Sequence, residues 1–274
     1  MSTMKQNLHT HTTFCDGQDT PEQLIRAAIA KGFSSIGFSG HSYNPHSLMF
    51  AGNVDRTKEY QQHIRMLQQK YKGIIDVYCG LEIEAAAVPE LSGYDFLIGS
   101  VHYFYVDNEF VGFDRSPDAV RKIVDTYFNG SGLAYARRYF ETLVKLPQYG
   151  QFDILGHFDI HAKNNEYLQI FDENDSEYIS MGYDAIDALA GKIPFFEVNT
   201  GGMARGYRSI PYPAPAFIRR MKEKGFSAVI TTDCHDAKYL DYGFDTACAL
   251  LKECGFREYY VFTERGFRAL PLEV

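Results

Sequence analysis

Apolar segments of strand length alternate along the chain with segments whose apolar residues recur at helical spacing. Between positions 59 and 71, for example, Tyr60, Ile64, Leu67 and Tyr71 form one apolar stripe. This alternation of short strands and amphipathic helices predicts an α/β fold. The expected strands cover residues 7–9, 34–38, 74–78, 96–101, 152–155, 195–198, 228–231 and 259–262.

Capping residues mark where several helices begin and end. Thr20, Pro21 and Gln23 have the spacing of an N-cap, a first helical residue and a capping box, so a helix is expected from there to positions 31–32. Other helices are expected to start at 116–117, 175–176 and 215, and to end at Gly225 and Gly255. Seven or eight strand–helix units without a linker or repeat favour a barrel, with residues 1–274 as a single domain and 126–148 as a helical elaboration over its mouth.

Composition narrows the class of protein. A chain of 274 residues with 20 Tyr and 21 Phe is long enough for one large core. The net charge of −8 argues against a nucleic-acid groove or an anionic membrane surface. The sequence contains no apolar run near the roughly 18 residues of a membrane span, and its start lacks a signal-peptide core, so a cytoplasmic enzyme is expected. Five Cys without Cys-x-x-Cys spacing indicate neither a disulfide framework nor a zinc ribbon.

Metal-binding residue types gather where the expected strands end. His9 and His11 lie two residues apart, as do Asp233 and His235, so each pair can reach one ion, and Glu82 follows an apolar run. Each feature alone has an ordinary structural explanation. Strand C-terminal ends, however, meet at one mouth of an α/β barrel, and six of the nine histidines fall there. The pattern therefore predicts a polynuclear metal hydrolase. Of the other histidines, His63 and His161 are expected to be structural or on the surface, and His46 is a candidate substrate contact.

The ordered motifs resemble the polymerase and histidinol phosphatase (PHP) family. They are His-x-His, an Asp five residues later, Gly-His, Gly-x-Glu, Ser-Val-His, Gly-His and Asp-x-His. The stretches at 99–102, 153–159, 197–202 and 255–258 are similar to the histidinol-phosphatase branch, over almost the whole chain. The resemblance implies a distorted (β/α)7 TIM-like barrel and hydrolysis of L-histidinol phosphate to L-histidinol in histidine biosynthesis. Two departures stand out: Gly40, where many relatives have Asp, and Cys234, expected to point away from its neighbours.

The resemblance also implies the ligands of two to three divalent ions. Imidazole and carboxylate ligands without thiolate suit Zn²⁺, Mn²⁺ or Fe²⁺. The first ion would be held by His9, His11, Glu82 and Asp233, the second by Glu82, His102 and His157, and the third by Asp16, His41 and His235.

A water shared by two such ions would become a hydroxide that attacks phosphorus. Glu82 is expected to bridge the ions, and Asp233 or His235 to help protonate the leaving alcohol. Arg205 and Arg208 are both candidates for the phosphate, and the sequence does not choose between them. Asp114 and Glu84 are candidates for the substrate ammonium and imidazole. The expected partner is a small phosphate monoester, and the oligomeric state is left open.

Three alternatives remain. The same metal set suits a phosphoesterase for another small phosphate, such as a nucleotide or sugar phosphate. A noncatalytic or proofreading PHP module of a polymerase is disfavoured by the intact ligand set. An amidohydrolase-like barrel shares His-x-His on its first strand, but it would usually carry a Lys where this chain has His102.

Overall fold

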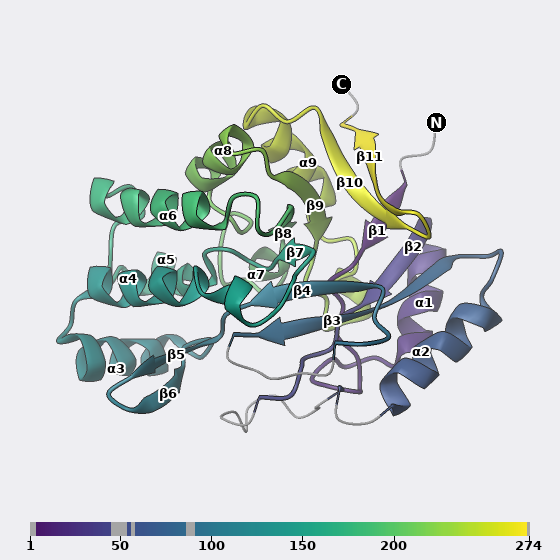
Figure 1. Cartoon of the computed structure of the whole chain (residues 1–274), viewed down its shortest axis with the longest axis horizontal. Helices are drawn as coiled ribbons and strands as arrows, with labels where there is room; N and C mark the ends of the chain where they lie inside the picture. The colour runs from purple at the N-terminus through teal and green to yellow at the C-terminus, as the bar shows by residue number, and fades with distance from the viewer. Residues whose placement is uncertain (1–3, 45–53, 56–57, 86–90, 273–274) are drawn as a thin grey trace.

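The computed structural model describes residues 4–44, 54–55, 58–85 and 91–272 (Figure 1). Its centre is a seven-stranded parallel sheet in the order β1-β2-β3-β4-β7-β8-β9. The strands are β1 (Lys5–Asn7), β2 (Phe33–Phe38), β3 (Asp76–Glu84), β4 (Phe96–Ser100), β7 (Ile154–Leu155), β8 (Phe195–Asn199) and β9 (Ser227–Thr231).

The two outer strands of this sheet meet just beyond their C-terminal ends. Thr10 and Cys234 form a parallel bridge, in which the His11 N–H donates to the Cys234 carbonyl at 2.8 Å and the Cys234 N–H to the His9 carbonyl at 3.0 Å. The sheet is therefore a nearly closed barrel, and the expected (β/α)7-type fold is confirmed. The bridge also brings the first and last metal-binding motifs together.

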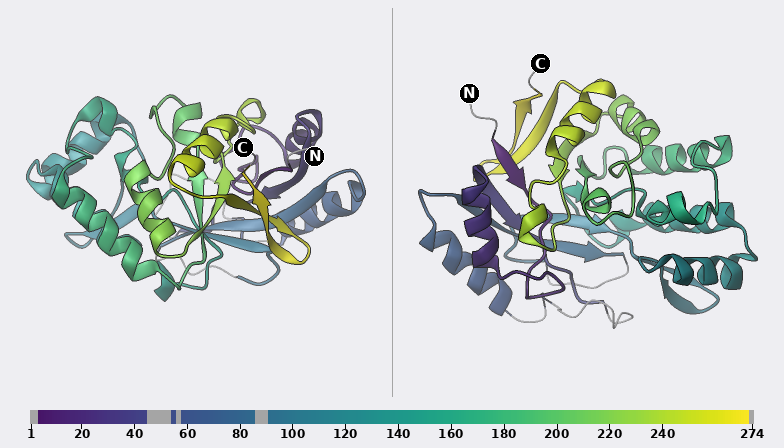
Figure 2. Two further views of the ribbon diagram at one scale, coloured as in Figure 1. Left: turned by 90° about the horizontal axis from the view of Figure 1, so that it is seen from above. Right: turned by 180° about the vertical axis from the view of Figure 1, so that it is seen from behind.

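The eighth expected strand does not join the barrel. Residues 259–262 lie in β10 (Glu258–Thr263), which pairs antiparallel with β11 (Gly266–Pro271), and this hairpin lies beside β1 and β9 (Figures 1 and 2). Its aromatic side chains, with Phe195, pack against the interior residues Leu8, Tyr78, Phe96, Ile98, Ile154 and Val229. The hairpin is held to β1 because Gln6 exchanges hydrogen bonds with the Phe262 backbone at 2.8 and 2.6 Å. A short apolar run cannot by itself distinguish a barrel strand from a strand that covers the barrel end.

The third strand is longer than expected. The prediction stopped at residue 78, whereas β3 continues to Glu84 and places Tyr78, Gly80, Glu82 and Glu84 at alternating positions of one strand. Gly80 is required inside the barrel, because a Cβ there would lie 2.3 Å from the Phe96 ring. Along this strand, the apolar Tyr78 therefore precedes Gly80, and the carboxylates of Glu82 and Glu84 follow it toward the C-terminal end.

Helices cover the outside of the sheet, and the predicted capping is observed. The Thr20 hydroxyl accepts from the Gln23 N–H at 3.3 Å, and Gln23 Oε1 accepts from the Thr20 N–H at 2.8 Å. Ser116, Asp175 and Pro215 also begin helices as expected. The helices are α1 (Pro21–Ala30), α2 (Glu59–Lys70), α3 (Pro117–Phe128), α4 (Gly132–Leu143), α5 (Asn165–Leu168), α6 (Ser176–Leu189), α7 (Gly201–Ala204), α8 (Pro215–Glu223) and α9 (Phe244–Glu253), with 3₁₀ turns at Leu146–Gln148, Ile160–Ala162 and Ala237–Tyr239.

Segment 126–148 is helical, as expected, and belongs to a stack formed by α3, α4, α5 and α6 at one side of the barrel (Figure 1). A hairpin of β5 (Tyr103–Val106) and β6 (Glu109–Gly112) adjoins this stack. One apolar cluster extends from Leu24 on α1 through the stack to Leu272. Within the described ranges, no helix is both long and apolar enough to span a bilayer.

Candidate metal centre

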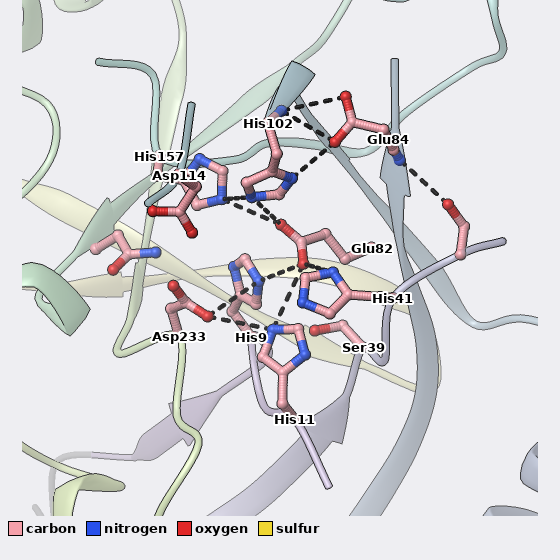
Figure 3. A network of polar contacts seen from close by, with 12 residues as sticks. His9, His11, Ser39, His41, Glu82, Glu84, His102, Asp114, His157 and Asp233 are labelled. Atoms are coloured by element: carbon pink, nitrogen blue, oxygen red, sulfur yellow. Dashed lines mark hydrogen bonds and ion pairs between the residues drawn. The ribbon is translucent and has the colours of Figure 1, made fainter. Parts of the chain in front are cut away.

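Two histidines after β1 and an aspartate after β9 form the first part of the site. The His9 and His11 rings lie 5.2 Å apart between centroids, and the Nε2 atoms of both approach Asp233 Oδ1, at 3.6 and 3.2 Å. Asp233 has φ of +46°, a left-handed conformation that is uncommon for a residue other than glycine. The backbone turns sharply there, and the carboxylate faces the two imidazoles (Figure 3).

Glu82 lies at the centre of the cluster and is 1% exposed (Figure 3). Its Oε1 lies 3.1 Å from His157 Nε2 and 3.6 Å from His102 Nε2. Its Oε2 lies 2.9 Å from His41 Nδ1, 3.3 Å from His9 Nε2 and 3.5 Å from His11 Nε2. The two carboxylate oxygens therefore face different sets of imidazoles, which is the geometry needed for a carboxylate shared by two ions.

A third group lies nearer the solvent. Asp16 Oδ2 lies 3.4 Å from His41 Nε2 and 3.3 Å from His235 Nε2, and Asp16 Oδ1 lies 3.5 Å from His11 Nδ1. The ligand atoms of His11, Asp16, His41 and His235 all lie within 4.8 Å of one another, as do those of His9, Glu82 and His157, and those of His9, His11 and Asp233. The structure thus brings all nine residues of the implied ligand set to one mouth, and it places His11 beside the outer group as well as the inner one.

Burial and the close packing of charges shift the acid–base equilibria of these groups. Burial lowers the pKa of the His9 imidazole, but the carboxylates of Glu197, Glu82 and Asp233 outweigh it and raise that pKa well above its ordinary value. Burial favours the neutral form of Glu82, yet the neighbouring histidines hold its pKa well below the usual range. The pKa of His11 falls to about 3, because the ring is buried and lies beside other histidines. Glu82 therefore remains ionised and needs positive charge next to it.

Unsatisfied buried polar atoms are a second, separate indication that these side chains bind metal ions. Among the described residues, His9 Nε2, His11 Nε2 and Glu82 Oε2 are buried and make no hydrogen bond of acceptable geometry, although each has another candidate ligand atom within 3.6 Å. Such atoms are costly to bury unless something else satisfies them. All three face the same space, and imidazole nitrogen and carboxylate oxygen suit Zn²⁺, Mn²⁺ or Fe²⁺.

A cavity of about 280 Å³ opens beside this cluster. Its size is close to the lower limit of ligand pockets, about 300 Å³, which favours a small molecule. Arg205 lines it and donates to the Asp233 carbonyl and to Asp233 Oδ2, both at 2.8 Å. Asp114 and Lys163 form a 2.6 Å ion pair on its wall, and the Lys163 ammonium lies 4.2 Å from the centre of the Tyr207 ring. Two cationic side chains therefore border a cavity that is otherwise rich in acidic groups.

The structure separates the two arginine candidates. Arg208 does not line this cavity. Its guanidinium is buried, and it donates to the Ala162 carbonyl at 3.0 Å and to Glu173 at 2.8 Å. His46 lies outside the described residues. The Cys234 side chain points away from the site, as expected, into the main apolar cluster.

The two remaining histidines and Gly40 also have clear places. His161 is 3% exposed and stacks on Tyr139, so it is a buried aromatic-cluster residue and not a surface one. His63 is on α2, near Phe14. A Cβ at Gly40 would lie 2.9 Å from Val54, so an Asp at this position would require Val54 to move.

Sequence reasoning missed two residues at or behind the site: Glu197 is fully buried next to His9, and Lys163 lines the cavity. Glu84, a sequence candidate for the substrate ammonium or imidazole, does not line the cavity and contacts His102 Nδ1 at 2.8 Å. The signal for Glu197 was available: a carboxylate between Phe196 and Val198 in an apolar strand is costly to bury unpaired. Lys163 left no such signal, because a lysine between secondary-structure elements is ordinary surface composition.

Comparisons with known proteins agree with this geometry. A family model described as PHP domain matches residues 7–200. The probable histidinol-phosphatase of Deinococcus radiodurans is 27% identical over 260 residues, covering 91% of this chain and 93% of its own length. The histidinol-phosphatase of Bacillus subtilis is 25% identical and covers 91% of this chain and 99% of its own.

Two solved structures have the same fold. One, a putative histidinol phosphatase from Listeria monocytogenes, superposes with a TM-score of 0.74 at 17% identity, covering 88% of this chain and 99% of the other. The other, histidinol phosphate phosphatase from Lactococcus lactis complexed with zinc, L-histidinol and phosphate, superposes with a TM-score of 0.68 at 22% identity, covering 96% and 98%.

Proposed function

Since this chain belongs to the PHP domain family, we propose that it hydrolyses L-histidinol phosphate to L-histidinol and phosphate in histidine biosynthesis. In terms of reaction class alone, the protein is a histidinol-phosphatase-like, metal-dependent phosphoesterase. The observation that carries the proposal is the convergence of nine His, Asp and Glu side chains at the barrel mouth, beside a cavity lined by Arg205. Relatives called histidinol-phosphatase, at 24–27% identity over about 90% of the chain, support this substrate over others.

The nine residues would hold two to three divalent ions in the groups already described. Bound ions of this kind lower the pKa of a water to near neutrality and offset the charge of phosphoryl oxygens. Glu82 would be a ligand shared by the two inner ions, because its Oε1 faces His157 and its Oε2 faces His9.

Arg205 would bind the phosphoryl group from the side of Asp233. A planar guanidinium can hold two phosphoryl oxygens at once. The ion pair with Asp233 fixes the orientation of Arg205 before substrate arrives, so less side-chain entropy is lost on binding. Lys163, on the Asp114 side of the cavity, supplies a second cation.

Asp114 and His235 would interact with the parts of the substrate other than the phosphoryl group. Asp114 is the carboxylate that could pair with the substrate ammonium, and it shares the cavity wall with Lys163. His235 also lines the cavity, and its side chain is 24% exposed, which supports a role beside the departing alcohol, either as a ligand of the outer ion or as a proton donor. Asp233 is less suited to give a proton, because Arg205 and His9 outweigh its burial and hold its pKa well below the ordinary value.

The experiment is a turnover assay against a panel of phosphate monoesters, including histidinol phosphate, a sugar phosphate, a nucleotide and phosphotyrosine. We expect kcat/KM for histidinol phosphate to exceed that of every other ester by at least about 100-fold, or roughly 2.7 kcal/mol of discrimination. Preference for another monoester would overturn the substrate and leave the phosphoesterase. Failure to hydrolyse any of them after loading with zinc or manganese would indicate a noncatalytic module.

A further inference from the structure

Behind the candidate ligands lies a carboxylate that faces no solvent and does not enter the cavity. Glu197 on β8 is 0% exposed. We propose that Glu197 is a positioning residue that holds His9 in the tautomer able to bind a metal ion, and that it sets the metal affinity of the barrel mouth in this way. This inference rests on the metal centre of the proposed function, not on the identity of the substrate.

Glu197 is placed by the alternation of β8. Phe195, Glu197 and Asn199 occupy alternate positions of the strand, so their side chains point to one face. That face is the barrel interior, because Phe195 packs against the interior apolar cluster. Glu197 therefore lies between the apolar interior and the candidate metal centre.

Four donors surround the two oxygens of this carboxylate. Oε2 lies 2.9 Å from His9 Nδ1 and accepts from the Thr231 hydroxyl at 2.7 Å. Oε1 accepts from the His157 backbone N–H at 2.6 Å and from Asn199 Nδ2 at 2.8 Å. One buried group thus contacts two of the candidate ligands, the ring of His9 and the backbone of His157.

The contact with His9 decides which ring nitrogen can face an ion. A neutral imidazole carries its proton on one nitrogen and its lone pair on the other. A carboxylate can only accept at Nδ1, so the proton stays there and the lone pair is on Nε2. Nε2 is the atom directed at Glu82 and Asp233, at 3.3 and 3.6 Å, and it has no hydrogen-bond partner among the described residues.

Glu197→Gln would reverse this arrangement without a change of volume. The new amide nitrogen cannot take the place of Oε1, because the His157 N–H and Asn199 Nδ2 both donate there. The Asn199 amide cannot flip to exchange its oxygen and nitrogen at low cost, since its Oδ1 accepts from the Gly201 N–H at 2.8 Å. The amide nitrogen must therefore take the place of Oε2, where the Thr231 hydroxyl can rotate to accept. It would then face a protonated Nδ1 of His9, which favours the other tautomer and removes the lone pair from Nε2.

The test compares zinc affinity, by chelator competition, in wild type, Glu197→Gln and a matched control, Thr231→Val. The control removes a hydrogen bond from the same carboxylate but leaves its charge and its contact with His9. We expect Glu197→Gln to weaken zinc binding 10–100-fold, the range for loss of such supporting contacts, and Thr231→Val to stay within about threefold. Thermal unfolding of the metal-free proteins shows that each variant is folded.

A double-mutant cycle separates positioning from general loosening. In a His9→Ala background, Glu197→Gln should have almost no further effect on zinc affinity, because the ring that it orients is gone. An equal loss in that background, an equal loss in Thr231→Val, or zinc affinity of Glu197→Gln within threefold of wild type would each overturn the proposal. This experiment measures metal affinity, whereas the turnover assay measures substrate preference. A protein that does not hydrolyse histidinol phosphate could therefore still confirm or refute the role of Glu197.

Discussion

Replacing Arg205 and Arg208 by Met should separate activity from stability. Arg205 lines the cavity, and one charged hydrogen bond to a phosphoryl oxygen is worth about 1.5–3 kcal/mol. At about 1.4 kcal/mol for each factor of ten, Arg205→Met should reduce kcat/KM by roughly 10–100-fold. The Arg205 side chain is 26% exposed and Asp233 is 8% exposed, but Asp233 keeps His9 and His11 beside it. Loss of the ion pair should therefore cost roughly 1–2 kcal/mol of folding free energy, between the values for exposed and buried pairs.

Arg208→Met should have the opposite profile. The Arg208 side chain is 1% exposed and its partner Glu173 is 20% exposed. Breaking a buried pair costs about 3–5 kcal/mol, and Glu173 can recover some hydration, so about 3 kcal/mol is expected. At roughly 2–4 °C for each kcal/mol in a chain of this size, the melting temperature should fall by roughly 6–12 °C. Met keeps roughly the volume of the alkyl stem, but the contact of the guanidinium carbon with the Tyr212 ring, 5.3 Å from its centre, is lost as well.

Steady-state kinetics well below both melting temperatures, with calorimetry on the same samples, measure the two effects. If Arg205 binds phosphate equally in ground and transition states, KM rises. If it binds mainly in the transition state, kcat falls. Arg205→Met within twofold of wild type, or Arg208→Met that loses activity without loss of stability, would refute the assignment of these two residues.

Three further predictions concern the metals and the barrel. Protein purified without chelator should contain two to three equivalents of transition metal by elemental analysis; less than one equivalent, with activity insensitive to chelation, would contradict a metal centre. Glu82→Gln should lower kcat by about 1,000-fold or more, about 4 kcal/mol, with an unchanged circular dichroism spectrum, whereas activity within tenfold would make Glu82 structural. Gly80→Ala should destabilise the fold by about 1–3 kcal/mol in urea titration, because its Cβ would lie 2.3 Å from Phe96; unchanged stability would argue against this packing.

The barrel and the candidate ligands were largely predictable from sequence, because both follow from local rules. Helix starts such as Thr20-Pro21 depend on neighbouring residues alone. Ligands at strand ends need only the rule that parallel strands share a C-terminal edge. His9, Glu82 and Asp233 could therefore be grouped before any coordinates, although they are separated by more than 70 residues at each step.

Other features depended on contacts between distant segments, and only the tertiary structure decided them. Arg205 and Arg208 are three residues apart in one loop, yet one lines the cavity and the other pairs with Glu173 on the helical side. The run at 259–262 is apolar like a barrel strand, but it pairs with β11 in a hairpin outside the barrel sheet. The role of Glu197 depends on three donors that other strands bring to it, since His9 follows β1, His157 follows β7 and Thr231 is on β9. The physical reason is that side-chain direction and burial depend on the whole set of neighbours, whereas strand and helix periodicity is local.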